Sequence, residues 1–218
     1  MGTITRSLSN NITTGGVILP AGITNSSVSA VTSFANASGG TLTLLSTQTA
    51  SNSATISFTT GLDSTYDAYE FHFIDIHPRT TAVDFQFNLS VDAGSNYNVT
   101  KTTTFFRGFH TEADDYALID YVTADDLAQS TAFQNLSIDT GNSADESCAG
   151  YLQLFNPAST TYVKHFVANV ANYNDSDICM PAYIAGYGNT TSACNAIQFK
   201  MSSGNFDGVI KLYGVKKS

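Results

Sequence analysis

Residues 66–110 constrain the fold of this chain more than any other stretch, because they have the pattern of consecutive β-strands separated by turns. Phe71 and Phe73, and further on Phe85 and Phe87, alternate with polar residues. Successive side chains of a strand point to opposite faces of a sheet, so each run has one apolar and one polar face. The turn sequences HPRTT and VDAGSN separate the runs. The stretch predicts a sandwich or barrel, and it contains no catalytic or nucleotide-binding motif.

Strand-like runs continue to the end of the chain, with Gly, Asn, Asp and Pro between them. Many short strands with frequent turns are typical of sandwiches and jelly rolls. We therefore expect an all-β fold, a β-sandwich of the jelly-roll type, over residues 41–218. Only Ala124–Ser130 (ADDLAQS) indicates a helical turn. The expected strands cover residues 41–47, 54–59, 67–76, 83–91, 99–109, 116–122, 133–138, 148–155, 162–170, 179–187, 195–201 and 208–215.

Residues 1–40 differ from the rest, being rich in Ser, Thr, Asn and Gly with isolated apolar residues. This composition predicts an extended N-terminal arm that packs on its own domain, on a neighbouring subunit or on a larger assembly. The alternation in residues 27–34 is that of a strand that could add to a sheet edge. The expected partner-binding residues are the apolar ones of the arm: Ile12, Val17, Ile18, Leu19, Ile23, Val28, Val31 and Phe34.

The charge balance excludes two classes of partner. Nine Lys and Arg face eighteen Asp and Glu, a net charge of −9. Nucleic acids and anionic membranes are bound by basic surfaces, so we expect neither as a partner. No segment approaches the roughly 20 apolar residues of a membrane span. The apolar run at residues 17–19 is too short for a signal peptide, so we expect no secretion signal.

Motifs of catalysis are missing from the sequence. It has no G-x-S-x-G, no P-loop and no G-x-G-x-x-G. A glycosidase would need two carboxylates facing a cleft, and a solvated acidic loop explains the acidic cluster after His110 more simply. We expect no catalytic residue, no cofactor and no enzymatic activity. The carboxylates of that cluster are Glu112, Asp114, Asp115, Asp125 and Asp126.

Metal sites are weakly indicated. Oxygen ligands for calcium could come from either of two groups, but Asx-turns account for the same side chains. The groups are Asp92, Ser95 and Asn98, and Asn172, Asn174, Asp175 and Asp177. Cys148, Cys179 and Cys194 show no C-x-x-C spacing. Three free cysteines are expected, with one disulfide as the alternative, and no metal is expected.

Exposed tyrosines offer a possible sugar-stacking surface. The candidates near strand ends and loops are Tyr116, Tyr121, Tyr173 and Tyr187. Core filling and cross-strand pairing explain most aromatic residues of a sheet equally well.

Several segments in order resemble virion structural proteins of tailed bacteriophages, marine ones in particular. They are DSTYDAYEFHFIDIHP (63–78), DAGSNYNVTKTTTFFRGFHTEAD (92–114), DLAQSTAFQNLSIDTG (126–141), LQLFNPASTTYVKHF (152–166) and IAGYGNTTSACNAIQFKMSSGNFDGVIKLYGVK (184–216). The resemblance covers most of residues 41–216. Residues Cys148, Cys179 and Cys194 are not part of the family pattern.

The resemblance implies a non-enzymatic protein of the virion exterior, made in the host cytoplasm. A capsid decoration or cement protein is favoured, because no coiled-coil, collagen-like or β-helical shaft is found. Its arm would bind the major capsid protein or another virion protein, and a homo-oligomer, a trimer, is expected. The alternative is a tail or fibre module that recognises host-surface glycan. A glycosidase is the third possibility.

Overall fold

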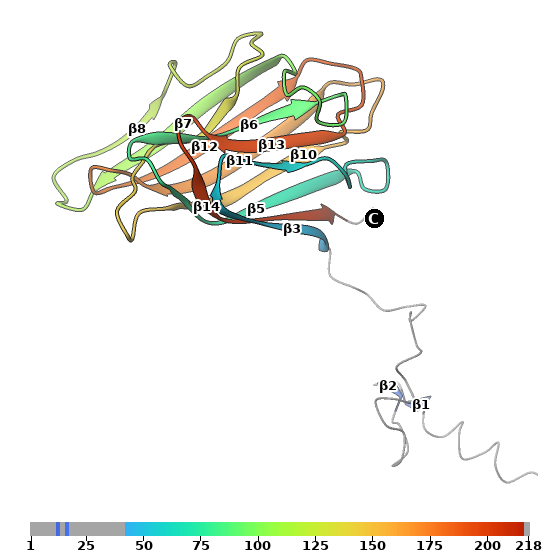
Figure 1. The fold of residues 1–218 in the computed structure, drawn as a ribbon, viewed down its shortest axis with the longest axis horizontal. Coiled ribbons are helices and arrows are strands. Elements are labelled where there is room, and N and C mark those ends of the chain that lie inside the picture. Colours follow the sequence, from blue (N-terminus) through green and yellow to red (C-terminus); the bar gives the residue numbers. More distant parts are fainter. Residues whose placement is uncertain (1–11, 14–15, 18–41, 216–218) are drawn as a thin grey trace, which may run out of the picture. The chain divides into compact units, whose positions relative to one another are not determined.

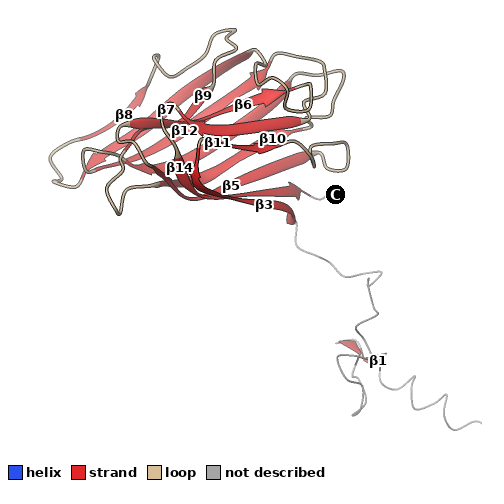
Figure 2. Cartoon of the chain, viewed as in Figure 1, coloured by secondary structure: helices blue, strands red, loops and turns tan. Residues whose placement is uncertain are grey.

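The computed structural model describes residues 12–13, 16–17 and 42–215, and strands are the only regular secondary structure within them (Figure 1, Figure 2). None of these residues therefore belongs to a helix that could cross a membrane. The chain divides into residues 1–39 and residues 40–218. In the first unit, β1 (Ile12–Thr13) pairs antiparallel with β2 (Gly16–Val17).

The second unit is a β-sandwich of two antiparallel sheets. The larger sheet has the strand order β3-β14-β5-β10-β11-β12-β7-β8, and the smaller has the order β4-β13-β6-β9. The strands are β3 (Leu42–Ser53), β4 (Thr55–Phe58), β5 (Ala68–Pro78), β6 (Val83–Ser90), β7 (Lys101–Thr111), β8 (Ala117–Tyr121), β9 (Gln134–Thr140), β10 (Cys148–Phe155), β11 (Lys164–Tyr173), β12 (Ile178–Gly188), β13 (Ala196–Met201) and β14 (Phe206–Val215).

The expected all-β sandwich is confirmed, and each expected strand overlaps an observed one. The largest difference is β3, which continues to Ser53 because it pairs along its length with β14. Such pairing brings together residues that lie at opposite ends of the described sandwich, so a local pattern gives no sign of it.

The helical turn expected at Ala124–Ser130 is wrong, since no helix forms there. Backbone groups of this segment bond to β7 instead of to one another. The Thr103 N–H donates to the Leu127 carbonyl at 2.9 Å, and the Lys101 N–H donates to the Ser130 carbonyl at 2.8 Å. These bonds to a strand replace the i→i−4 bonds that a helix would need.

The partner-binding residues expected in the arm fall mostly outside the described residues. Only the backbone of Ile12 and Val17 is described, as a register pair between β1 and β2. The strand expected at residues 27–34 also lies outside the described part. The remaining residues of that prediction, outside it as well, are Ile18, Leu19, Ile23, Val28, Val31 and Phe34.

Aromatic rings fill the space between the two sheets. Phe199 on β13 packs against Phe71 and Phe73 of the larger sheet, with ring centroids 5.3 and 5.2 Å apart. It also stacks with Phe85 on β6 at 5.9 Å. All four rings are buried, so a phenylalanine from one sheet meets those of the other and holds the layers together.

Two lysines are buried in the same sandwich. Lys101 on β7 and Lys164 on β11 both lie opposite Gly188 of β12 in register. The Lys101 amine donates to Asn88 Oδ1 at 2.5 Å and to the Val99 carbonyl at 2.9 Å. The Lys164 amine donates to two backbone carbonyls, at 2.6 and 3.1 Å. Neutral oxygen acceptors thus replace water around both amines.

Candidate binding surface on the larger sheet

The outer face of the larger sheet carries ordered rows of side chains across its strands. One row runs Tyr151, Asn169, Tyr183 and Phe106, each opposite the next in register on β10, β11, β12 and β7. A parallel row two residues further along the strands runs Gln153, Val167, Ala185 and Thr104. The strand period of two places all of these on one face.

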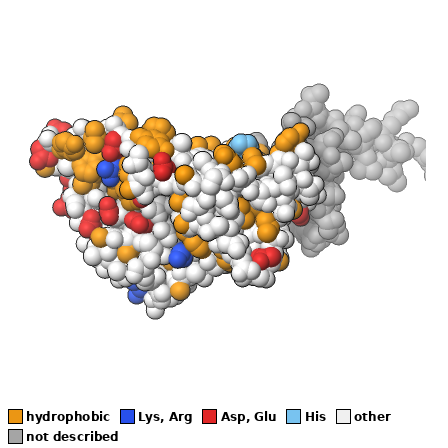
Figure 3. All heavy atoms as spheres, turned by 90° about the horizontal axis from the view of Figure 1, so that it is seen from above, with side chains coloured by type: hydrophobic (Ala, Val, Ile, Leu, Met, Phe, Trp, Pro, Cys, Tyr) orange, Lys and Arg blue, Asp and Glu red, His pale blue; other side chains and the backbone are white. Residues whose placement is uncertain are grey.

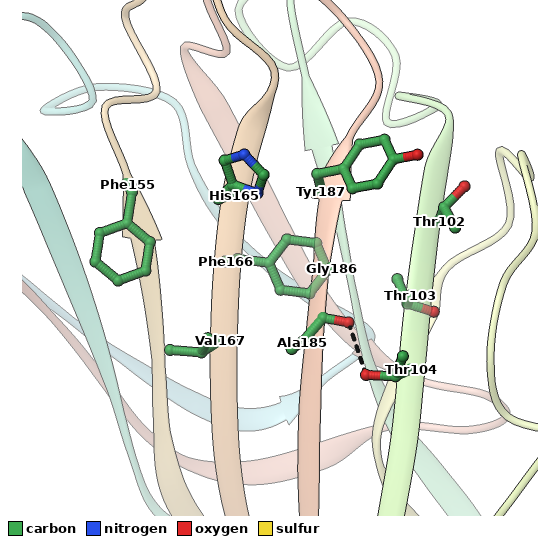
Figure 4. A pocket seen from close by; sticks show the side chains of 10 residues that line it. All are labelled: Thr102, Thr103, Thr104, Phe155, His165, Phe166, Val167, Ala185, Gly186 and Tyr187. Carbon is green, nitrogen blue, oxygen red and sulfur yellow. Dashed lines mark hydrogen bonds between the residues drawn. The ribbon is translucent and has the colours of Figure 1, made fainter.

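Small residues in the second row leave a shallow hollow between aromatic neighbours. We call it the outer groove, with hollows of about 370 and 340 Å³ that share lining residues. Figure 4 shows one wall and the floor, with the Thr104 hydroxyl donating to the Ala185 carbonyl at 3.2 Å. Its floor is Val167, Ala185 and Thr104, its first wall is Phe155, His165 and Tyr187, and its second wall is Tyr151, Tyr183 and Phe106.

The outer groove has no Asp, Glu, Lys or Arg among its lining residues. On the strand beside β10 the surface becomes charged: on β5, Glu70 pairs with His72 at 2.5 Å, opposite Gln153 and Tyr151 of β10. In a chain with a net charge of −9, an uncharged face crossing four strands is distinctive. Its aromatic walls, with Tyr183 52% exposed, form a surface that offers stacking and hydrogen bonding without ion pairs.

A second exposed apolar surface lies at the edge of the same sheet. Strand β8 pairs with β7 alone, and Ile119 at its centre is 84% exposed. Tyr116 and Leu118 beside it are exposed too. Figure 3 shows hydrophobic side chains beside acidic ones at the left end of this view, the end labelled β8 in Figure 1. We call this surface, residues 116–121, the β8 edge.

The tyrosines predicted for sugar stacking separate in the structure. Tyr187 lies in the first wall of the outer groove, 6.0 Å from the His165 ring. Tyr121 packs edge-on against Phe106 at 4.9 Å, beside the second wall. Tyr116 lies against Phe109 on the β8 edge. Tyr173 donates to Asp177 at 3.0 Å, a bond that raises the pKa of the phenol to about 12.

Sequence reasoning missed Tyr151, Tyr183 and Phe106, the second wall of the outer groove. All three lie within strands, where alternation predicts one buried and one solvated face. The signal available was in β12, whose sequence ICMPAYIAGYG has no polar face. Apolar residues on both faces of a strand indicate contacts on both sides.

The acidic residues after His110 do not converge on one site. Asp114 accepts from His110 at 3.2 Å, Asp115 accepts from Thr111 at 2.6 Å, and Asp126 accepts from Tyr121 at 2.5 Å. Burial raises the pKa of Asp125, whose carboxylate accepts from the Asn135 amide at 2.7 Å.

Asp84, a carboxylate that the sequence did not single out, resembles Asp125 in its raised pKa. Burial raises the pKa of Asp84, and the Asn135 amide bonds to it as well, at 3.4 Å. The two carboxylates thus share one amide donor.

The calcium candidates take part in turns. Asp92 accepts from Ser90 Oγ at 2.6 Å and from Asn96 Nδ2 at 2.7 Å, and these bonds lower its pKa to about 2. Asn174 Oδ1 accepts from the Ser176 and Ile178 N–H groups, each at 3.0 Å. Over residues 42–215, no three His, Cys, Asp or Glu side chains are grouped to hold a metal ion.

All three cysteines are free, as the sequence favoured. Cys148 and Cys194 are buried and Cys179 is exposed. Burial raises the pKa of the Cys148 thiol to about 12 and that of Cys194 to about 11, so both are protonated at neutral pH.

No protein-family model, curated protein or solved structure matches this chain.

Proposed function

We propose that this protein is a non-enzymatic structural protein of a tailed-bacteriophage virion, a decoration or cement subunit of the capsid exterior. The sequence segments that resemble such proteins support this proposal, and the observation that carries it in the structure is the β8 edge. The protein would be made in the host cytoplasm and would stabilise the shell by binding the major capsid protein or another virion protein. A homo-oligomer, a trimer, fits this role.

The strand order supports a jelly roll as the finer description of the sandwich. The run β3-β14-β5-β10 of the larger sheet faces β4-β13-β6-β9 of the smaller one. This is the interleaved order of two Greek keys, the arrangement of a jelly roll. We interpret β7, β8, β11 and β12 as additions that widen one sheet, and β8 is the outermost of them.

The β8 edge has the properties of a strand that accepts a partner. An edge strand presents unpaired backbone groups, and monomeric proteins protect such strands with lysines, prolines or short length. Strand β8 has five residues, close to the usual strand length, and it has no lysine or proline. Its one charge, Asp120, is paired with Arg107 at 3.0 Å. An 84% exposed Ile119 at this position supports strand addition by a neighbouring virion subunit.

Replacing Ile119 by lysine is expected to reduce the number of copies bound to capsids lacking this protein by at least tenfold. A lysine at the centre of the strand would place a charge against the apolar side chains of the partner. Leu44→Lys is the matched control, because Leu44 is 53% exposed on β3, the strand at the opposite edge of the same sheet.

Deleting residues 1–40 tests the predicted arm in the same assay. We expect the shortened protein to lose capsid binding while its sandwich stays folded.

Quantifying the chain by mass spectrometry in separated heads and tails tests the assignment itself. High copy number in heads supports the decoration role. Equal binding of wild type and Ile119→Lys contradicts the part assigned to the β8 edge. Absence of the chain from purified particles contradicts the virion proposal altogether.

A second candidate function is a glycan-recognising module of a tail or fibre. The aromatic walls of the outer groove are the observation that favours it. Low copy number, confined to tails, is the result that would select this candidate.

A further inference from the structure

We propose that the outer groove, on the outer face of the larger sheet, binds a neutral oligosaccharide. This inference deepens the second candidate function. The inference rests on that function only for where the sugar would be met, because sugar binding can be measured on the isolated protein.

The groove is about as long along the strands as it is wide across them. Its two walls lie four residues apart along each strand, which corresponds to about 14 Å at 3.4 Å per residue. It crosses β10, β11, β12 and β7, a span of roughly 14 Å at 4.8 Å per strand. The two hollows share Thr104, Val167 and Ala185, so they are parts of one continuous depression. A chain molecule several rings long fits such a site, and each hollow lies within the usual size range of ligand sites.

The chemistry of the groove is that of a surface for sugar rings. A pyranose has an apolar C–H face and a rim of hydroxyl groups, so it requires aromatic faces and neutral hydrogen-bonding groups together. Tyr187 and Tyr183 offer ring faces on either side of the floor. Thr102, His165 and Asn169 offer donors and acceptors in the same rows. Specific sites combine apolar walls with a few polar groups in this way.

The charge of the protein favours neutral sugars over anionic ones. No lining residue is an Arg or Lys that could pair with a sulfate, phosphate or carboxylate. The net charge of −9 also repels anionic glycans from the whole surface. A neutral oligosaccharide has neither difficulty, because its binding requires no ion pair.

The backbone beneath the groove excludes an extended peptide as the preferred occupant. Strands β10, β11, β12 and β7 are each paired on both sides, so their N–H and C=O groups are taken up by the sheet. Strand addition requires a free edge, which the groove lacks and the β8 edge provides. A ligand of the groove therefore binds through side chains alone, as a sugar does.

The experiment is calorimetric titration of the full-length protein with the neutral hexasaccharides of maltose, cellulose and chitin type, and with a galacturonate hexasaccharide as the anionic comparison. We expect one of the neutral series to bind and the anionic one not to bind. Tyr183→Ala and Tyr151→Ala are expected to weaken binding at least tenfold, and Tyr183→Phe to retain it because the ring face remains. Affinity should change less than about twofold between low and high salt, because no ion pair is involved.

Controls separate loss of binding from loss of folding. Tyr183→Thr replaces the tyrosine by a β-branched residue, which also favours strands, and should fold while losing affinity as Tyr183→Ala does. Tyr162→Ala is the matched surface control, since Tyr162 is 71% exposed outside the groove, and it should bind as wild type does.

Three results would overturn the proposal. The first is that no neutral oligosaccharide binds, and the second is that binding persists in both Tyr183→Ala and Tyr151→Ala. The third is self-association in solution that Tyr183→Ala abolishes while no sugar binds, because the face would then be an interface between copies. None of these results bears on the presence of the chain in capsids, so the virion proposal is tested separately.

Discussion

Replacing Phe199 by alanine is expected to lower the free energy of unfolding by about 3–5 kcal/mol, the usual cost of removing a buried phenylalanine. Phe199 is fully buried, and its ring packs against Phe71 and Phe73 of the larger sheet and Phe85 of the smaller one. Its removal leaves a cavity between the two sheets, and because backbone pairing makes each sheet stiff, the neighbouring rings cannot fully close the space. The total free energy of unfolding of a small domain is roughly 5–15 kcal/mol, so this loss is a large part of the stability.

Urea denaturation of the wild type and of three variants measures this effect. Phe199→Leu should lower the free energy of unfolding less than Phe199→Ala does, because leucine leaves a smaller cavity. Tyr162→Ala, at an exposed position, should change stability by no more than about 0.5 kcal/mol. A loss below about 1 kcal/mol for Phe199→Ala would show that the core relaxes around the missing ring.

Raising the pH from 7 to 9 is expected to stabilise the folded protein. Burial lowers the pKa of Lys101 to about 7, against the opposing influence of Cys194, while an unfolded chain keeps the ordinary value of 10.5. Between pH 7 and 9 the unfolded chain therefore binds one more proton at this residue than the folded chain does. Stability then rises with pH by about 1.4 kcal/mol per unit, or up to about 3 kcal/mol over this range.

Other buried groups set the limits of this rise. Burial also lowers the pKa of Lys164, which adds to the effect in the same direction. Cys148 and Cys194 act in the opposite direction above pH 9, because their thiols ionise in the unfolded chain while burial keeps them protonated in the folded one. The rise in stability should therefore stop near the ordinary thiol pKa of 9.0.

Chemical denaturation at several pH values between 6 and 10, under reducing conditions, tests this profile. Lys101→Met should lower the slope of the unfolding free energy against pH between pH 7 and 9 by the equivalent of about one proton. Lys164→Met is the parallel variant. The methionine cannot donate to Asn88 and Val99, so the absolute stability of the variant is not the readout. A wild-type profile that is flat or falls between pH 7 and 9 is incompatible with a neutral, buried Lys101.

The candidate surfaces were only partly predictable. Tyr187 and Tyr121 were identified in the sequence, and the structure places them in and beside the outer groove. Tyr151 and Tyr183, which form the second wall of the groove, come from other strands, and no local sequence pattern reveals how those strands pair. The exposure of Ile119 was also hidden, because an apolar residue in a strand is normally expected in the core.

The sequence by itself determined where the strands lie and that the fold is all-β, because alternation with a period of two is a local property that each run carries alone. Tertiary structure alone decided that β3 pairs with β14, that Lys101 and Lys164 point into the sandwich, and that the apolar outer face of β10, β11 and β12 is turned away from the second sheet. Alternation shows that a strand has two faces. Which face meets the second sheet, and which is turned away from it, depends on the pairing of strands that are distant in the sequence.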